Sequence, residues 1–319
     1  MLHKLLMTAR YKLICKLSWY LVYQWRGNES MITLLAPAKV NLCLRVCGKT
    51  ESGLHNLDSI VVFCQFGDKI SISSADHDSF FGCGPFAPSL TATNNEENLV
   101  ITARDAFRAN GGVCGPIAII LDKEIPVGAG LGGGSADAAA TLRALNKIAS
   151  TPLSDDQLFA IASTLGSDVP VCLASTPHRV NGTGDVIRPL NEIHAGAVLL
   201  VNPIVPLSTA DVFAQVTPPY NQPLPEITDH SAVHLCDFGN DLEAAATTFV
   251  PEISDLLTRL RQTPKCRAAQ MSGSGASCFG IFDDIETASL AATTFENDGI
   301  WAKATKLHPL DVPTDGVLY

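Results

Sequence analysis

The sequence predicts an α+β protein, built as a two-domain α/β sandwich. The chain has 319 residues, 46% of them hydrophobic, which is enough for two ordinary domains that each bury a core. Runs of β-branched residues alternate with stretches of helical spacing along the chain, which indicates sheets and helices within the same units. We expect domains over residues 31–190 and 191–319, and no linker marks the boundary between them.

Residues 1–30 differ from the rest of the chain. They contain five basic residues and one acidic residue, whereas the whole chain has a net charge of −10. No cleavage site of small residues follows them, and polar residues interrupt their apolar stretch, which argues against a transmembrane span. A targeting or membrane-associating role and an upstream start codon both fit such an extension, and we favour translation from Met31.

The charge and the cysteines limit the kind of function. A net charge of −10 is unfavourable for sequence-independent binding of nucleic acid, which needs a basic face. The ten cysteines are scattered through apolar segments without a CxxC pair, so we expect free, buried thiols in a reducing compartment. The sequence therefore predicts a cytoplasmic protein that acts on a small molecule, and it leaves the oligomeric state open.

Patterns in the first half predict several strands before a central glycine-rich loop. Apolar and β-branched runs predict strands at residues 31–35, 40–46, 59–63, 69–73 and 117–121. Residues 36–39 indicate a break between the first two strands. Residues 98–110 have helical spacing, and the glycine pair 111–112 is expected to end that helix.

In the second half, helices and strands alternate. The segment 138–145 is a strong helix former, and Ser154 with Gln157 predicts a capping box for a second helix over 155–164. The pattern predicts strands at 196–201, 276–282 and 301–306, and helices at 208–215, 251–261 and 286–295. Residues 215–226 are rich in proline and indicate a surface loop.

The glycine-rich loop is the most informative segment. Residues 126–137 are PVGAGLGGGSAD, and their five glycines expose backbone N–H groups where side chains normally intervene. The helix that follows directs its free N–H groups and its positive dipole end at the same point. Each glycine costs roughly 0.5 to 1 kcal/mol relative to alanine, so five together favour a bound anion over simple packing.

Two common phosphate loops do not fit this segment. Gly128, Gly130 and Gly133 satisfy the GxGxxG spacing, but a dinucleotide-binding fold needs a strand after the helix, and here a second helix follows. A Walker A loop needs a lysine before its serine, and Gly134 precedes Ser135. The loop is therefore predicted to belong to another kind of phosphate site.

Four further segments, taken with the loop, resemble the superfamily of galactokinase, homoserine kinase, mevalonate kinase and phosphomevalonate kinase. They are PAKVNL at 37–42, GLH at 53–55, GSDVP at 166–170 and MSGSGAS at 271–277. These segments occur in the order of the family and span nearly all of the chain after Met31. The triple glycine and the Pro-Ala-Lys-x-Asn start most closely resemble the family of 4-diphosphocytidyl-2-C-methyl-D-erythritol kinases.

The resemblance implies a fold, a reaction and its cofactors. The N-terminal domain would be like ribosomal protein S5 and the C-terminal domain ferredoxin-like, with the active site in the cleft between them. The enzyme would use ATP and Mg²⁺ to phosphorylate the 2-hydroxyl of 4-diphosphocytidyl-2-C-methyl-D-erythritol in non-mevalonate isoprenoid synthesis. Another small-alcohol kinase, such as one acting on homoserine, and a catalytically silent sensor of nucleotide or metabolite are the alternatives.

Phosphoryl transfer to an alcohol needs a group that orients the hydroxyl or accepts its proton. Asp168 is the candidate, and we expect Lys39, which lies in an apolar stretch, to pair with it. The resemblance implies an ATP site formed by Pro126, Val127, Gly128, Ala129, Gly130, Leu131, Gly132, Gly133, Gly134, Ser135, Asn98 and Leu99. The Ser135 hydroxyl is the candidate metal ligand, because Ala136 replaces the second serine common after the loop.

The acceptor side is expected to include Asn41, His55, Phe213 and the second glycine segment, Gly273, Ser274 and Gly275. An imidazole offers one donor and one acceptor to a base edge, and the resemblance implies that His55 binds the cytosine ring. Leu54 stands where the family usually has tyrosine, so one stacking face for that ring is missing. Phe213 is the candidate for the opposite face.

Overall fold

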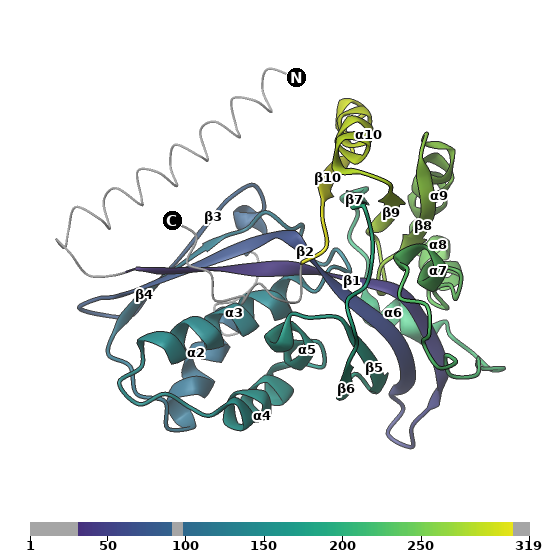
Figure 1. Cartoon of the computed structure of the whole chain (residues 1–319). Coiled ribbons are helices and arrows are strands. Elements are labelled where there is room, and N and C mark those ends of the chain that lie inside the picture. The colour runs from purple at the N-terminus through teal and green to yellow at the C-terminus, as the bar shows by residue number, and fades with distance from the viewer. Residues whose placement is uncertain (1–30, 91–97, 309–319) are drawn as a thin grey trace.

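The computed structural model describes residues 31–90 and 98–308, so the predicted extension at residues 1–30 lies outside the described part. Two sheets with helices packed against them form the described molecule (Figure 1). The six-stranded sheet has the order β3-β4-β2-β5-β6, with β1 paired to β2, and the four-stranded sheet has the order β10-β7-β9-β8. The α+β class predicted from the sequence is confirmed.

The strands are β1 (Ile32–Lys49), β2 (His55–Ser74), β3 (Ser79–Cys83), β4 (Ile117–Asp122), β5 (His178–Gly182), β6 (Val186–Pro189), β7 (Ala197–Asn202), β8 (Cys266–Met271), β9 (Cys278–Phe282) and β10 (Trp301–Thr305). The helices are η1 (Ala87–Leu90), α2 (Leu99–Ala109), α3 (Gly133–Ile148), α4 (Asp155–Leu165), α5 (Val169–Ala174), α6 (Thr209–Ala214), α7 (Ala232–Cys236), α8 (Glu243–Phe249), α9 (Glu252–Gln262) and α10 (Ile285–Asn297). In the first sheet all strands end before residue 190, and in the second all begin after it.

The first two strands are longer than the sequence pattern indicates. The expected break at residues 36–39 is wrong, because β1 continues through it with register shifts between Pro37 and Lys39 and between Asn41 and Cys43. A bulge accommodates a proline, which has no N–H to donate to the ladder, without ending the strand. Likewise, the runs at 59–63 and 69–73 belong to the single strand β2.

Helices α2, α3, α4 and α5 cover one face of the six-stranded sheet (Figure 1). The predicted capping box of Ser154 and Gln157 is present, and at the start of α2 the Asn98 side chain accepts the N–H of Val100. The core beneath them contains Phe107 and Leu142 together with apolar residues of β1, β2 and β4. Sequence patterns missed the short elements β3, β5, β6, β8, α5, α7 and α8, which are too short for a periodic signal.

The strand β1 crosses from the first sheet into the core of the second. Its residues Leu44 and Val46 are buried in the cluster that packs β7 and β9 against α9 and α10. The Leu44 N–H donates to the Gly239 carbonyl, and the Leu44 carbonyl accepts the N–H of Asp241, both at 2.9 Å. The middle of β1 therefore lies where the two sheets meet.

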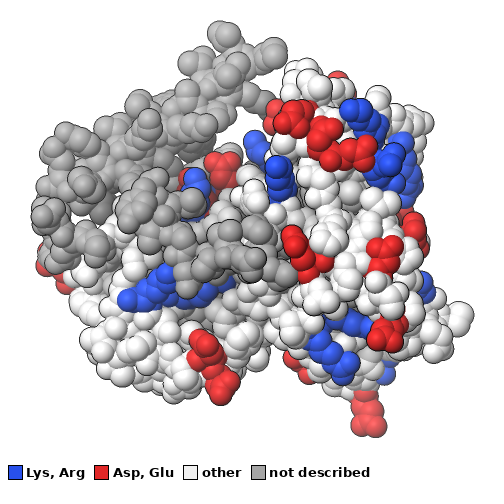
Figure 2. All heavy atoms as spheres, in the orientation of Figure 1, with Lys and Arg blue, Asp and Glu red and all other residues white. Residues whose placement is uncertain are grey.

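The thiols of the described residues differ at one position from the sequence analysis. Eight cysteines in the described ranges are free thiols, but Cys83 is disulfide-bonded, so the expectation of free thiols throughout is wrong at that position. Basic and acidic residues are interspersed over the visible part of the face in Figure 2. Within residues 31–90 and 98–308, the helices are too short or too polar to cross a membrane.

Candidate active site

A cavity of about 330 Å³ lies where the two sheets meet, and it brings together residues from distant parts of the chain. Lys39 and Asn41 come from β1, Asp168 precedes α5, and Phe213 comes from α6. The other predicted site residues along its wall are Leu99, Gly128, Ala129, Gly130, Gly132, Gly133, Gly134, Ser135, Gly273 and Ser274. Phosphate loop, charged pair and second glycine segment therefore share one cavity.

The glycine-rich loop needs glycine for its backbone conformation. Gly128, Gly130 and Gly132 have φ values of +70°, +73° and +63°, in the left-handed region that other residues rarely adopt. Gly133 begins α3, so the N–H groups of its first turn have no partner within the helix. Pro126, Val127 and Leu131 do not line the cavity, and Leu131 is buried beneath the loop. The arrangement is that of an anion site at a helix N-terminus.

Backbone contacts lock the loop to β1 and to the second glycine segment. The Lys39 N–H donates to the Leu131 carbonyl at 2.9 Å. The Ser272 hydroxyl accepts the N–H of Asn41 at 3.2 Å and donates to the Gly130 carbonyl at 3.1 Å. The Ser277 N–H donates to the Ala129 carbonyl at 3.1 Å. Ser272, which the sequence analysis did not single out, thus joins all three segments.

Lys39 and Asp168 form an ion pair in the cavity wall. Lys39 Nζ lies 2.7 Å from Asp168 Oδ1, and the side chains are 6% and 42% exposed, respectively. Asp168 stands at the N-cap position of α5, where Pro170 fixes the first turn, so the carboxylate is held at the end of a rigid element. The buried ammonium has its charge partner, and the carboxylate keeps access to solvent.

Asn41 is fixed by a chain of hydrogen bonds. Its Nδ2 donates to Ser59 Oγ at 2.8 Å, and the Ser59 hydroxyl donates to the Cys43 carbonyl at 2.6 Å. Ser59 lies on β2 and also lines the cavity. The sequence analysis missed Ser59, because its role depends on the pairing of β1 with β2.

Two of the predicted acceptor residues, His55 and Phe213, form an aromatic cluster with Tyr220. Phe213 lines the cavity, whereas His55 and Leu54 do not. The rings of His55 and Phe213 stack with centroids 5.3 Å apart, and the Tyr220 ring meets His55 edge-on at 6.3 Å. Burial lowers the pKa of His55, which favours the neutral ring. Phe213 thus contacts His55 directly, while Leu54 is 58% exposed in the turn before β2.

The second glycine segment is held by side chains of the C-terminal domain. Asn240 Nδ2 donates to the carbonyls of Met271 and Gly273 at 2.8 and 2.9 Å, and the hydroxyls of Thr209 and Ser274 are 2.8 Å apart. Gly275 packs beneath the turn and does not line the cavity. On the opposite wall, Asn98 caps α2 while its neighbour Leu99 reaches the cavity.

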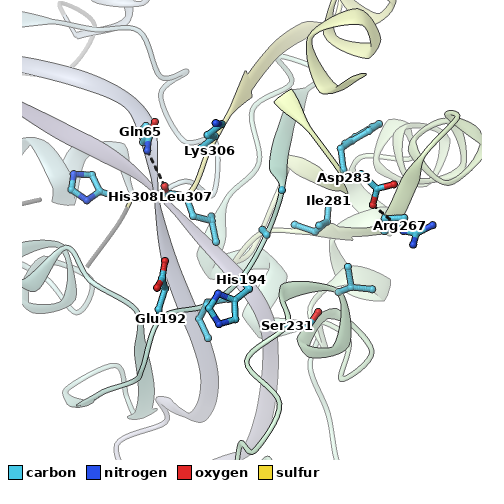
Figure 3. A pocket seen from close by; sticks show the side chains of 15 residues that line it. Gln65, Glu192, His194, Ser231, Arg267, Ile281, Asp283, Lys306, Leu307 and His308 are labelled. Atoms are coloured by element: carbon cyan, nitrogen blue, oxygen red, sulfur yellow. Dashed lines mark hydrogen bonds and ion pairs between the residues drawn. The ribbon is translucent and has the colours of Figure 1, made fainter. Parts of the chain in front are cut away.

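A larger hollow of about 580 Å³ lies away from this site, near Lys306 and His194 (Figure 3). Arg267 and Asp283 on its wall form an ion pair, and Gln65 donates to the Leu307 carbonyl. Neither the glycine-rich loop nor the Lys39–Asp168 pair reaches it. The smaller cavity, which contains both the loop and the ion pair, is therefore the candidate active site, although the hollow near Lys306 is larger.

Comparisons with protein families and solved structures define the class. Residues 98–176 match the family model for the GHMP kinases N terminal domain, and residues 228–299 match that for the GHMP kinases C terminal. A crystal structure of 4-(cytidine 5'-diphospho)-2C-methyl-D-erythritol kinase, 30% identical, superposes with a TM-score of 0.73 over 87% of this chain and all of that one. The fold is that of a GHMP kinase.

Curated relatives narrow the class further. The 4-diphosphocytidyl-2-C-methyl-D-erythritol kinase of Brucella abortus biovar 1 (strain 9-941) is 44% identical over 87% of this chain and 96% of its own length. The enzyme of the same name from Sinorhizobium medicae (strain WSM419) is 42% identical over 82% of this chain and 90% of its own. The chain belongs to the 4-diphosphocytidyl-2-C-methyl-D-erythritol kinase family of the GHMP kinases.

Proposed function

We propose that this protein transfers the γ-phosphoryl group of ATP to the 2-hydroxyl of 4-diphosphocytidyl-2-C-methyl-D-erythritol, a step of non-mevalonate isoprenoid precursor synthesis. The single observation that carries the mechanism is the Lys39–Asp168 pair, which lies on the same cavity as the glycine-rich loop. The loop and the N-terminus of α3 supply backbone N–H groups for the phosphates. The Lys39–Asp168 pair would contact the acceptor hydroxyl.

In the proposed reaction, Asp168 orients the acceptor hydroxyl and accepts its proton. The hydroxyl oxygen forms a bond to the γ-phosphorus, the bond from that phosphorus to the β–γ bridging oxygen breaks, and ADP leaves. Asp168 Oδ1 is paired with Lys39, and its other oxygen has no partner among the described residues. The Lys39 ammonium, paired with Asp168, would lie beside the acceptor oxygen as that oxygen bonds to phosphorus.

We propose that Mg²⁺ accompanies ATP at this site. Residues 31–90 and 98–308 contain no group of three or more His, Cys, Asp or Glu side chains that could hold a metal. Mg²⁺ that is bound largely by nucleotide phosphates and water needs only one or two protein oxygens, and the Ser135 hydroxyl on the cavity wall fits that need. The ion would neutralise charge on the transferred phosphoryl group.

The cellular site of the reaction is also a proposal. Eight free thiols in the described part and a nucleotide substrate suit a reducing compartment. We therefore assign the enzyme to the cytoplasm, as a protein that acts on small molecules.

An ADP-release assay tests the proposed function. Purified protein with ATP and Mg²⁺ is expected to release ADP when the cytidyl alcohol is added and to give a monophosphate ester at its 2-hydroxyl, identified by ³¹P NMR. Homoserine in place of the cytidyl alcohol should give no release above the rate without acceptor. Nucleotide binding without turnover would instead support a silent sensor, and release with homoserine alone would change the substrate.

Replacing Leu54 with tyrosine should strengthen binding of the cytidyl alcohol. Leu54 is 58% exposed beside the His55–Phe213 stack, so an aromatic side chain there would offer a new face to the base. Base–aromatic stacking is worth about 1–3 kcal/mol, and we expect KM for the cytidyl alcohol to fall about fivefold or more, with KM for ATP unchanged. Val113→Tyr, at another exposed position, is the control. An unchanged or higher KM in Leu54→Tyr contradicts the assignment of this pocket.

A further inference from the structure

A buried ionic cluster lies at the base of the glycine-rich loop, and the mechanism above does not use it. Lys123, Asp68 and Asp137 are 2%, 0% and 2% exposed. Lys123 Nζ donates to Asp68 Oδ2 at 2.6 Å and also to Asp137 Oδ2. Lys123 directly follows β4, Asp68 lies on β2 and Asp137 lies on α3, so β4 and α3 on either side of the loop meet β2 here.

Each end of the loop is tied to this cluster. Asp68 Oδ1 accepts the backbone N–H groups of Glu124 and Ile125 at 2.6 and 2.8 Å, immediately before the loop begins at Pro126. Asp137, the last residue of the segment 126–137, lies in the first turns of α3. The Lys123 ammonium binds both carboxylates, so a single charged group fixes where the chain enters and where it leaves the loop.

The ammonium also lies close beneath the first residue of α3. A Cβ atom placed on Gly133 would stand 3.1 Å from Lys123 Nζ and 3.5 Å from Asp68 Oδ2. The N–H groups at the start of α3 therefore depend on the position of this ammonium, and glycine at 133 allows the close approach.

Stability alone does not account for such a cluster. Burial and the neighbouring Asp137 raise the pKa of Asp68, and the Lys123 ammonium opposes that shift. Burial alone would lower the pKa of Lys123, but the two carboxylates raise it, so the ammonium keeps its charge. Because apolar residues of similar volume often stabilise a core as well as buried ions do, the geometry that the cluster imposes is its distinguishing property.

We propose that Lys123, with Asp68 and Asp137, is a positioning residue for the phosphate donor. By tying both ends of the glycine-rich loop to one ammonium, it holds the backbone N–H groups of the loop and of α3 in the arrangement that binds the phosphates of ATP. This inference rests on the proposed function of the loop and goes beyond the residues that touch substrate.

Asp137→Asn tests the proposal, because it keeps the shape of the side chain and removes one of the two charges that hold Lys123. We expect KM for ATP to rise about tenfold, equivalent to about 1.4 kcal/mol, and KM for the alcohol to stay within twofold. Asp137→Glu, which restores the carboxylate, should recover part of the loss. If Asp137→Asn does not fold, Asp68→Asn is measured in its place.

The control is Asp78→Asn, which alters a carboxylate that also pairs with a cation but is 33% exposed and lies away from the cavity. Asp78 also joins a cation, Arg108, to a backbone N–H, that of Ile117. Equal loss of thermal stability in both variants with no change in KM for ATP would show a merely structural role, and a joint rise of both KM values would show general loosening. Either result overturns the proposal.

The dissociation constant for ATP, measured by calorimetry without acceptor, separates this proposal from the proposed function. If the wild-type chain binds ATP but turns over no cytidyl alcohol, the proposed function fails, and a tenfold weaker affinity of Asp137→Asn still supports the positioning role. Equal affinities of the wild type and Asp137→Asn reject it.

Discussion

Asp168→Asn is expected to lower kcat by roughly 10²- to 10⁴-fold, the range typical for loss of a general base. The amide keeps the size of the side chain but does not accept the proton of the attacking hydroxyl. Asp168 is 42% exposed at the cavity, so the substitution changes little packing. KM for ATP should change by less than threefold, because the phosphates bind at the glycine-rich loop.

Steady-state ADP release and a thermal melt, measured together, check this expectation. The melting temperature should fall only modestly, since the asparagine oxygen still accepts a hydrogen bond from the largely buried Lys39 ammonium. Asp298→Asn, at an exposed aspartate paired with Arg259, is the matched control and should leave kcat unchanged. A kcat within tenfold of the wild type in Asp168→Asn would remove Asp168 from the proposed mechanism.

Much of the fold could be predicted because several of its helices have local sequence signals. Helix α2 has apolar spacing, an asparagine cap and a terminal glycine pair, and α4 has a complete capping box. The single long strand β1 could not be predicted in the same way. From the local sequence, Pro37 predicts the end of a strand. Only the pairing with β2 shows that the strand continues through a bulge.

The residues of the candidate site also differ in whether a local sequence signal indicates them. Lys39, Asp168 and the glycine-rich loop belong to short motifs, and the structure brings them to one cavity. Ser59 belongs to no motif, and the MSGSGAS motif that contains Ser272 does not by itself indicate what that hydroxyl contacts. Their hydrogen bonds arise from which strand or turn lies next to β1, and that is a property of the tertiary fold.

The aromatic cluster shows the limit of reasoning from residue types. The sequence analysis chose Phe213 to stack on a base opposite Leu54, and the structure places Phe213 directly on the His55 ring with Tyr220 at its edge. Tyr220 lies within the proline-rich loop at 215–226 and carries no signal of its own. Its neighbour Asn221 donates its N–H to the Val46 carbonyl, which ties this part of the loop to β1.

Gly130→Ala is expected to have the largest effect on stability among the glycine substitutions in the loop. A Cβ atom at Gly130 would stand 2.5 Å from the Gly275 carbonyl oxygen and 2.7 Å from that of Ser272. Both are backbone atoms, so neither can rotate away, and the loop must separate from the second glycine segment. That separation breaks the hydrogen bonds from Ser272 Oγ to Gly130 and from Ser277 to Ala129.

Gly128→Ala is the control that isolates this contact. Its φ of +70° is close to the +73° of Gly130, but a Cβ there meets no described atom within 4 Å. Both variants carry the left-handed strain of about 1–2 kcal/mol, so the difference between their free energies of unfolding measures the contact between the two glycine segments. Urea denaturation should give Gly130→Ala a further loss of about 2 kcal/mol or more. Equal losses of unfolding free energy in Gly130→Ala and Gly128→Ala would mean that the contact between the two glycine segments does not contribute to stability.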